Sequence, residues 1–427
     1  PGDPANVVIR GARILDPAAG IDREGDLVIR DGVIGGDPDG LEVVDGTGLT
    51  VIPGIVDVHV HLRTPGKEHA EDIVTGTASA AAGGVVTVLA MPNTQPPTDN
   101  PSILGSLLDR ASREAVVPTG FIPAITVGQA GESLTEHGDL AEAGAAALSD
   151  DGVPVGSALV MRRALQYQKA TGLLFTLHEE DMSLSGTGVM HEGVVSARIG
   201  LAGIPGVSEA VQVARDCSLA AYEDGRIHVC HVSARETVDE IRLAKARGVQ
   251  VTAEVTPHHL LLTDDAVGDD PDPAKFKMNP PLRSTDDREA LIEALVDGTI
   301  DCIATDHAPH PGDEKENPFA AAPFGVIGLE TAFPACYTAL VLGGRMDLTD
   351  LVLRMSTTPA RIFGLPVPTL ADGATANLAL LDLAATDVVG ARPYASKSTN
   401  AAFVGMELTG RVVMTLAGGQ DVYRRTA

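Results

Sequence analysis

The sequence predicts an α/β protein: a TIM (β/α)8 barrel with a small β-sandwich-like domain built from both chain ends. In the middle of the chain, apolar runs alternate with longer stretches rich in Ala, Leu, Glu and Arg. At both ends, apolar and polar residues alternate with a period of two instead. We therefore expect residues 53–365 to form the barrel, and residues 1–52 plus 366–427 to form one composite β domain.

The apolar runs of the central region can be counted as eight strands, the number that closes a TIM barrel. The expected strands lie near 53–60, 84–91, 119–125, 144–149, 173–178, 226–231, 250–255 and 299–305. Helical stretches between them lie at 98–115, 154–171, 208–223, 235–248 and 285–298. Near-continuous apolar strands are typical of a parallel sheet that is covered on both faces.

The two chain ends have the pattern of short antiparallel strands. Segments such as NVVIRGARILD near the start and ATANLALLDL near the end alternate in period two and are separated by Gly and Asp turns. Because these sets match in character and flank the barrel in sequence, the simplest interpretation is a single β domain.

The composition excludes several classes of function. The 427 residues are 44% hydrophobic and 21% charged, which suits a globular protein with a large core. A net charge of −27 repels nucleic-acid backbones and anionic lipid surfaces, so we expect neither as a partner. The longest uncharged run, 73–98, is interrupted by Gly and Pro and does not predict a membrane span. Four widely spaced cysteines and the lack of a signal-peptide pattern favour a cytoplasmic location.

Metal-binding residue types gather where the expected strands end. Asp57, His59 and His61 share one face of the first strand, with the histidines roughly 7 Å apart at about 3.3 Å per residue. The other strand-end residues are Asp150, Asp151, His178, His231, Asp306, His307 and His310. A lone buried histidine is more often a hydrogen-bonded core residue, but five such strand ends in one barrel converge on one cavity. Histidine nitrogens with carboxylate oxygens suit Zn, Mn, Co, Ni or Fe better than Ca or Mg.

The remaining histidines carry a weaker signal. We expect Asp57 to orient one of the strand-end histidines rather than to bind an ion itself. His258 and His259 follow the seventh strand and could line the mouth of the pocket, although solvated or structural roles are favoured. The others, His69, His137, His191 and His228, lack a strand-end position or a partner.

An ordered set of motifs resembles the amidohydrolase superfamily and, within it, the dihydroorotase family of the bacterial long-chain type. The motifs are DVHVHLR (57–63), MPNT (91–94), SDDG (149–152), HEE (178–180), CHVS (230–233), TPHHL (256–260), MNPPLR (278–283), ATDHAPH (304–310) and PFGVIGLET (323–331). The resemblance extends from about residue 6 to residue 415.

The resemblance implies a reversible ring closure between N-carbamoyl-L-aspartate and dihydroorotate, a step of pyrimidine biosynthesis. It implies two divalent metal ions, by default Zn²⁺: His59 and His61 on the first, His178 and His231 on the second, and Asp151 bridging them. Asp306 would bind the first metal and act as the catalytic proton carrier. The residues implied to hold substrate are His61, Arg63, Asn93, Asn279, His310, Phe324 and Gly325.

One departure from the wider superfamily concerns the bridging group. Many binuclear relatives use a carbamylated lysine at the fourth strand, but the only lysine between residues 93 and 178 is Lys169, which lies in a helical pattern. A carboxylate must then bridge any pair of metals. The choice of Asp151 over Asp150 follows the family pattern, since only one of two successive residues can point inward.

Substrate charge separates the alternatives. Dihydroorotate has a carboxylate on its ring, whereas hydantoins and dihydrouracil have none, and Arg63 with Asn93 is a candidate clamp for that anion. The alternatives are a dihydropyrimidinase, hydantoinase or allantoinase, and a non-catalytic dihydroorotase-like subunit of a transcarbamoylase complex.

A homodimer or a complex with aspartate transcarbamoylase is expected from the family. The Gly/Pro-rich segments 269–283 and 310–325 are expected to be binding loops, of which at least one orders over the substrate.

Overall fold

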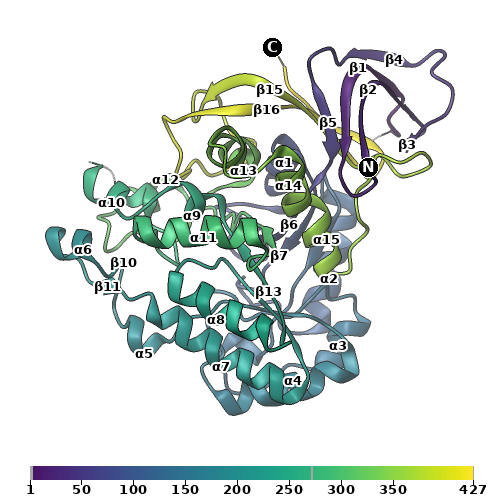
Figure 1. Cartoon of the computed structure of the whole chain (residues 1–427). Coiled ribbons are helices and arrows are strands. Elements are labelled where there is room, and N and C mark those ends of the chain that lie inside the picture. The colour runs from purple at the N-terminus through teal and green to yellow at the C-terminus, as the bar shows by residue number, and fades with distance from the viewer. Residues whose placement is uncertain (1–2, 271–272, 427) are drawn as a thin grey trace.

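The computed structural model describes residues 3–270 and 273–426. It consists of a barrel of parallel strands surrounded by helices, with a β-sheet attached at the top of Figure 1, where both chain ends lie. Residues 1, 2 and 427 of the predicted β domain lie outside the described residues, as do residues 271 and 272 of the predicted loop.

The attached sheet has eight strands and draws them from both ends of the chain. Its order is β17-β16-β15-β5-β1-β2-β3, and β4 pairs with β1. The strands are β1 (Val7–Asp16), β2 (Ile21–Arg30), β3 (Val33–Ile34), β4 (Glu42–Asp45), β5 (Thr50–Pro53), β15 (Leu378–Val388), β16 (Glu407–Ala417) and β17 (Gln420–Arg424). The antiparallel pair of β5 with β15 joins the two chain ends, with Leu378 opposite Pro53. The exact domain boundaries, 1–52 plus 366–427 and 53–365, stay a prediction.

The barrel strands form two parallel sheets, β6-β7-β8 and β9-β12-β13-β14. Their bounds are β6 (Ile55–Val60), β7 (Val85–Ala90), β8 (Thr119–Phe121), β9 (Phe175–Leu177), β12 (Arg226–Val229), β13 (Gln250–Val255) and β14 (Cys302–Ile303). All six residues of β6 are buried, as expected for a strand covered on both faces.

Single hydrogen-bonded contacts close these two sheets into a ring. On one side, Leu148 forms an isolated parallel bridge with Phe175, and the Ala146 amide donates to the Phe121 carbonyl at 3.0 Å. On the other side, Val60 bridges to His307. The strand expected at 144–149 is therefore reduced to one bridge, because this segment makes only isolated bonds to its neighbours before it turns. The (β/α)8 fold class is nevertheless confirmed.

The five predicted helices are all present, within a few residues of the expected ends. The longer helices are α1 (Ile73–Ala82), α2 (Pro101–Glu114), α4 (Ala158–Thr171), α7 (Val207–Glu223), α8 (Arg235–Ala246) and α11 (Thr285–Asp297). The start of α2 follows from its sequence: Pro101 suits a first helical turn, and the Asn100 side chain accepts from the Ile103 amide at 3.1 Å.

Short elements fill the connections. They are η1 (Val127–Gln129), α3 (His137–Glu142), α5 (Met182–Ser185), β10 (Met190–His191), α6 (Val194–Ile199), β11 (Gly203–Ile204), α9 (Pro257–Leu261), α10 (Asp265–Asp269), η2 (Pro273–Phe276), α12 (Gly312–Lys315), η3 (Leu329–Thr331), α13 (Ala332–Cys336), η4 (Tyr337–Leu342), α14 (Leu348–Val352), η5 (Leu353–Thr357) and α15 (Thr358–Ile362). Several of them, including η2 and α12, lie in the segments predicted to be binding loops.

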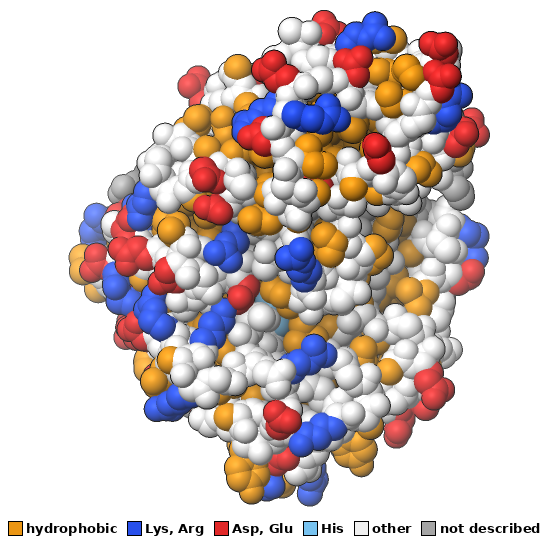
Figure 2. All heavy atoms as spheres, turned by 45° about the vertical axis from the view of Figure 1, so that its right-hand side comes forward, with side chains coloured by type: hydrophobic (Ala, Val, Ile, Leu, Met, Phe, Trp, Pro, Cys, Tyr) orange, Lys and Arg blue, Asp and Glu red, His pale blue; other side chains and the backbone are white. Residues whose placement is uncertain are grey.

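The helices, the charged surface and the cysteines can be compared with the composition. Within the described ranges, no helix has both the length and the apolar character needed to cross a lipid bilayer. Acidic and basic side chains are interspersed on the face shown in Figure 2. The four cysteines are all buried and free, as predicted for core residues.

Candidate active site

The strand-end histidines and aspartates meet in one place. His59 lies on β6 and His61 directly follows it, while His178 follows β9, His231 follows β12 and Asp306 follows β14. These are the C-terminal ends of the barrel strands, which is where TIM-barrel enzymes build their active sites. All of these side chains are buried.

Asp151 lies at the centre of the cluster. Its Oδ1 is 3.3 Å from His59 Nε2 and 3.7 Å from His231 Nε2, and its Oδ2 is 3.6 Å from His61 Nε2. Two groups of potential ligands, each with atoms within 4.8 Å of one another, share this carboxylate: His59, His61 and Asp151, and Asp151, His178 and His231. The arrangement offers two neighbouring cation positions with one carboxylate between them.

The donor atoms of this cluster fit divalent cations. His59 Nε2 and Asp151 Oδ1 are both buried and have no hydrogen-bond partner among the described residues. Leaving such a polar atom unsatisfied costs about 1–3 kcal/mol, and a cation bound between the two atoms would satisfy both. Imidazole nitrogens with a carboxylate are a ligand set that zinc and similar metals prefer.

A third group of potential ligands is less suited to an ion. It combines His59, Cys230 and Glu254. Burial, with the nearby Glu254 charge, raises the pKa of the Cys230 thiol to about 12, so the sulfur keeps its proton. Glu254 Oε1 already lies 2.6 Å from His59 Nδ1, which leaves the opposite ring nitrogen of His59 to face Asp151.

Neighbouring charges shift the pKa values of the buried groups in the site. Burial lowers the pKa of His59, but the carboxylates of Asp151 and Glu254 outweigh burial and hold that pKa well above its ordinary value. Burial raises the pKa of Asp306, but the hydrogen bond from His61 and the charge of His59 bring it down to about 2. Asp306 is therefore ionised at neutral pH and can accept a proton.

Three site residues have left-handed backbone conformations, which are uncommon outside glycine. The φ angles are 56° at Arg63, 32° at His231 and 48° at Asp306. Such conformations cost about 1–3 kcal/mol each and cluster at functional sites, where the surrounding structure holds them. In Asp306 the result is a carboxylate whose Oδ1 is 2.9 Å from His61 Nε2 and 3.5 Å from His59 Nε2.

A cavity of about 620 Å³ opens onto the cluster. Every residue predicted to hold substrate lines it, namely His61, Arg63, Asn93, Asn279, His310, Phe324 and Gly325. Gly152 and Ala308, which the sequence did not single out, line it as well. Five of the six predicted metal ligands line the same cavity, namely His61, Asp151, His178, His231 and Asp306.

Arg63 is buried in the wall of this cavity, with 7% of its surface exposed. Its Nε donates to the Pro309 carbonyl at 3.1 Å, and its terminal nitrogen lies 3.3 Å from His310 Nε2. Among the described residues, no carboxylate forms an ion pair with its guanidinium. A buried cation without a direct ion-pair partner is costly, so this site suits an anionic ligand.

The amide and imidazole groups of the wall also hold each other. Asn93 Oδ1 lies 2.8 Å from His61 Nδ1, and Asn93 Nδ2 donates to Asp151 at 3.4 Å. Burial, and then the charge of Arg63, lowers the pKa of His310 to about 4, so its ring is neutral at pH 7. His310 Nε2 lies 2.8 Å from the Phe324 carbonyl, which orients the ring toward the cavity wall.

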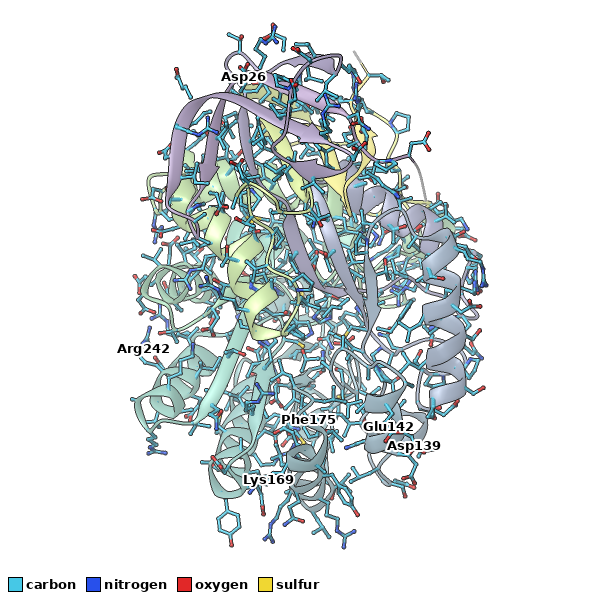
Figure 3. The ribbon with its side chains drawn as sticks, turned by 90° about the vertical axis from the view of Figure 1, so that its right-hand side faces the viewer. Asp26, Asp139, Glu142, Lys169, Phe175 and Arg242 are labelled. Atoms are coloured by element: carbon cyan, nitrogen blue, oxygen red, sulfur yellow. The ribbon has the colours of Figure 1, made fainter. Side chains whose placement is uncertain are left out.

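The structure resolves the choice between the two adjacent aspartates. Asp150 accepts from the Thr126 amide at 3.0 Å and also from the Thr126 hydroxyl, so its carboxylate points away from the histidines. Asp151 is the one that faces the cluster. Lys169 lies on α4, is exposed and projects at the bottom of Figure 3, far from the β domain marked by Asp26. Because the last turn of α4 leads into the start of β9, the exposed Lys169 lies at the end of the barrel opposite the strand ends that carry the histidines.

The expectation for Asp57 was wrong in its detail. The Asp57 carboxylate accepts from the backbone amides of His59 and Thr305, at 3.1 and 3.2 Å, and so orients backbone rather than an imidazole. Glu254 on β13 orients the His59 ring instead, and its other oxygen lies 3.1 Å from His228 Nε2. His228, which lacked a partner in the sequence, is part of this buried chain.

Glu180 and Asn400 are further residues that sequence reasoning missed. Glu180 Oε2 lies 3.1 Å from His178 Nε2 and accepts from Asn279 Nδ2 at 2.9 Å. The HEE motif held the signal for Glu180, because a carboxylate two residues after a strand-end histidine can reach its ring. Asn400 bonds to Ala308, Gly325 and His310 in the cavity wall, but it lies far from them in the sequence, and no motif indicated this contact.

A (β/α)8 barrel with a buried His/Asp cluster at its strand ends defines the class of the protein, an amidohydrolase. The family described as Dihydro-orotase-like matches residues 48–237. A protein named dihydroorotase from Anaeromyxobacter dehalogenans is 48% identical over 97% of this chain and 97% of its own length. Another so named, from Geobacter metallireducens, is 46% identical over 98% of this chain and 100% of its own. The chain belongs to the dihydroorotase family.

A solved structure supports the same class. The L-hydantoinase (dihydropyrimidinase) from Arthrobacter aurescens is 28% identical, with a TM-score of 0.83 and coverage of 98% of both chains. The chain is therefore a cyclic amidohydrolase enzyme of the fold that the sequence predicted.

Proposed function

We propose that this enzyme is a dihydroorotase, which interconverts N-carbamoyl-L-aspartate and dihydroorotate in pyrimidine biosynthesis. The observation that carries the proposal is the buried guanidinium of Arg63, which forms no ion pair with any residue that the structure describes and lines the same cavity as the His/Asp cluster. Dihydroorotate has both parts that this cavity suits: a cyclic amide for the cluster and a carboxylate for Arg63.

The proposed metal ligands are His59, His61, Asp151, His178, His231 and Asp306, with Asp151 shared between two divalent ions, by default zinc. Bound there, the ions would lower the pKa of water and polarise the amide carbonyl. Glu254 orients the ring of His59, with its Oε1 2.6 Å from His59 Nδ1, and Glu180 orients the ring of His178, with its Oε2 3.1 Å from His178 Nε2.

Asp306 moves the proton. In the ring-opening direction, the oxygen of water adds to the ring carbonyl carbon while Asp306 takes the proton of that water. The bond between carbon and ring nitrogen then breaks, and Asp306 delivers the proton to the departing nitrogen. Ring closure runs through the same steps in reverse. The low pKa of Asp306, about 2, keeps it ionised and ready to accept.

Arg63 and the cavity wall hold the substrate. The guanidinium of Arg63 and the amide of Asn93 bind the ring carboxylate, while Asn279 and His310 supply further polar contacts. The backbone at Phe324 and Gly325 borders the ring; at Gly325 a φ of 133° and contacts of 2.8 Å to an added Cβ leave no room for a side chain.

The decisive experiment measures metal content per chain together with turnover of dihydroorotate and dihydrouracil. We expect metal-dependent turnover of dihydroorotate and little of dihydrouracil, with the preference lost in Arg63→Ala. Preferred turnover of dihydrouracil or allantoin that survives Arg63→Ala would identify a different cyclic amidohydrolase. Metal-free protein without turnover after reconstitution would identify a non-catalytic subunit of a transcarbamoylase complex.

We further propose a cytoplasmic enzyme that forms a homodimer and can associate with aspartate transcarbamoylase. Sedimentation of the purified chain, alone and mixed with aspartate transcarbamoylase, tests both associations. A chain that sediments as a monomer and does not bind the transcarbamoylase would refute both associations, and this result would leave the proposed dihydroorotase reaction untouched.

A further inference from the structure

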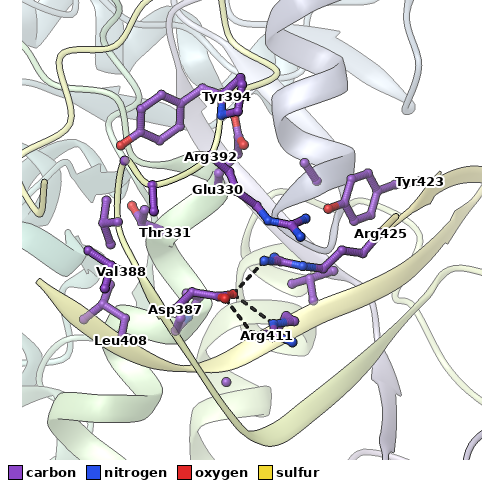
Figure 4. Close-up of a pocket in the computed structure, with 18 residues that line it drawn as sticks. Glu330, Thr331, Asp387, Val388, Arg392, Tyr394, Leu408, Arg411, Tyr423 and Arg425 are labelled. Atoms are coloured by element: carbon purple, nitrogen blue, oxygen red, sulfur yellow. Dashed lines mark hydrogen bonds and ion pairs between the residues drawn. The ribbon is translucent and has the colours of Figure 1, made fainter. Parts of the chain in front are cut away.

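A second cavity, of about 830 Å³, lies away from the His/Asp cluster, where β15, β16 and β17 cover the ends of α1 and α13 (Figure 4). None of the residues proposed for catalysis or substrate binding lines it. Three arginines do: Arg392, Arg411 and Arg425. In a chain of net charge −27, three guanidinium groups around one cavity are a local exception.

The arginines are only partly neutralised. Asp387 accepts two hydrogen bonds from Arg411, at 2.9 and 2.7 Å, and pairs with Arg425 at 2.9 Å. Two cations therefore share one carboxylate, as the dashed lines of Figure 4 show. Arg392 donates to the Thr426 carbonyl at 3.1 Å and forms no ion pair within the described part of the chain.

The other acidic group of the cavity is engaged elsewhere. Glu330 Oε1 accepts from the Ser79 hydroxyl at 3.0 Å and from the amides of Ala395 and Ser396, at 2.9 and 3.3 Å. These donors belong to α1 and to the segment after Tyr394, not to the arginine group. The lining thus holds three arginines and two carboxylates, of which only Asp387 pairs with an arginine.

The rest of the lining is apolar or aromatic. Ala82, Pro334, Val388, Leu408 and Val412 contribute aliphatic surface. In Figure 4, the ring of Tyr423 lies beside the guanidinium groups of Arg392 and Arg425. A ligand that fills this cavity would therefore place an anionic group among the arginines and an apolar body against the remaining wall.

We propose that this cavity is a binding site for a phosphate monoester with an apolar or aromatic body. The planar forks of arginine match phosphate oxygens, and the three terminal oxygens of a phosphate monoester can engage three guanidinium groups, whereas a carboxylate has only two oxygens. The site is separate from the proposed catalytic function and does not depend on it.

Calorimetric titration of the whole chain with three probes tests the chemistry. At constant ionic strength, phenyl phosphate should bind at least ten-fold more tightly than inorganic phosphate, which lacks the apolar body. It should also bind more tightly than benzoate, whose carboxylate offers two oxygens to the arginines instead of three. Failure of phenyl phosphate to bind at millimolar concentration, or equal binding of all three probes, would overturn the proposal.

Variants of Arg392 test whether phenyl phosphate binds in this second cavity. Arg392 is exposed, so Arg392→Ala and Arg392→Glu should fold normally, and both should weaken phenyl phosphate binding ten-fold or more, the reversal more than the deletion. The matched control is Arg242→Ala, an exposed arginine on α8 that pairs with Asp239 and Asp297. Equal binding by the Arg392 variants and the control would refute the assignment.

The first cavity must be excluded as the source of the signal, because Arg63 could also attract a phosphate. Titrations are therefore repeated in Arg63→Ala and with saturating dihydroorotate. Binding that persists in both supports the second cavity. Binding that either treatment abolishes belongs to the first cavity and overturns the proposal.

Discussion

Removing the charge of Glu254 should weaken metal binding by one to two orders of magnitude. Glu254 is fully buried, and its two oxygens lie 2.6 Å from His59 Nδ1 and 3.1 Å from His228 Nε2. Burial raises its pKa, but His59 and His228 outweigh burial and hold the pKa well below the ordinary range. Glu254→Gln keeps the shape of the side chain and removes the charge that fixes the His59 ring.

The size of the effect follows from the bond that is lost. A hydrogen bond to a charged group contributes about 1.5–3 kcal/mol, and about 1.4 kcal/mol corresponds to a factor of ten. Residues that orient metal ligands typically contribute about 10–100-fold in affinity or activity, which agrees. We therefore expect a 10- to 100-fold loss, measured as the zinc dissociation constant by chelator competition and as kcat/KM for dihydroorotate.

A control separates this effect from general loss of stability. Glu209 is also a buried carboxylate of the barrel, but it accepts from the amides of Ser233 and Ala234 and contacts no proposed metal ligand. Glu209→Gln should lower stability without a comparable change in metal affinity. If folded Glu254→Gln protein binds zinc as tightly as the wild type, or if both variants lose affinity equally, the orienting role of Glu254 is refuted.

Four further outcomes are expected. Asp306→Asn should retain most of its metal but lose about 10²–10⁴ in kcat, and near-normal turnover would remove Asp306 as the proton carrier. Arg63→Lys should raise KM about ten-fold, because lysine cannot make the bidentate contact; an unchanged KM would refute the clamp. Chelator treatment should abolish turnover and lower the melting temperature, both restored by zinc, and a metal-stripped enzyme that stays active would contradict the site. Burial, followed by the charge of Arg283, lowers the pKa of His191 to about 4, so the folded state loses stability as the pH falls from 6.5 toward 4. Denaturant titrations at several pH values should show that His191→Gln reduces this pH-dependent loss of unfolding free energy by about 1 kcal/mol. An unchanged dependence of stability on pH in the variant would refute the role of His191.

The barrel and most of the His/Asp cluster could be predicted because their signals are local. His59 and His61 are two residues apart on a buried strand, so the period of the strand alone puts them on one face. His178 and His231 each follow an apolar strand, and barrel topology then brings the strand ends together. Local pattern plus one topological rule was sufficient.

The partners of these residues could not be predicted in the same way. Glu254 is 195 positions from His59, and their contact depends on the stagger between strands rather than on any pattern within one strand. The choice between Asp150 and Asp151 depends on the Thr126 amide, which only the folded chain brings near. The short contact segment at 144–149 likewise depends on how two sheets close, which hydrophobic periodicity does not encode.

Asn400 ties the C-terminal part of the chain to the wall of the proposed substrate cavity, because it bonds to three residues that line it. Its Nδ2 donates to the carbonyls of Ala308 and Gly325, at 3.3 and 3.1 Å, and its Oδ1 accepts from the His310 amide at 3.2 Å. A fragment that stops at residue 365 would keep every proposed metal ligand but lose these hydrogen bonds of Asn400 to the cavity wall. Attempts to shorten this enzyme to its barrel, or to exchange its sheet for that of a relative, must therefore carry the stretch around Asn400 along.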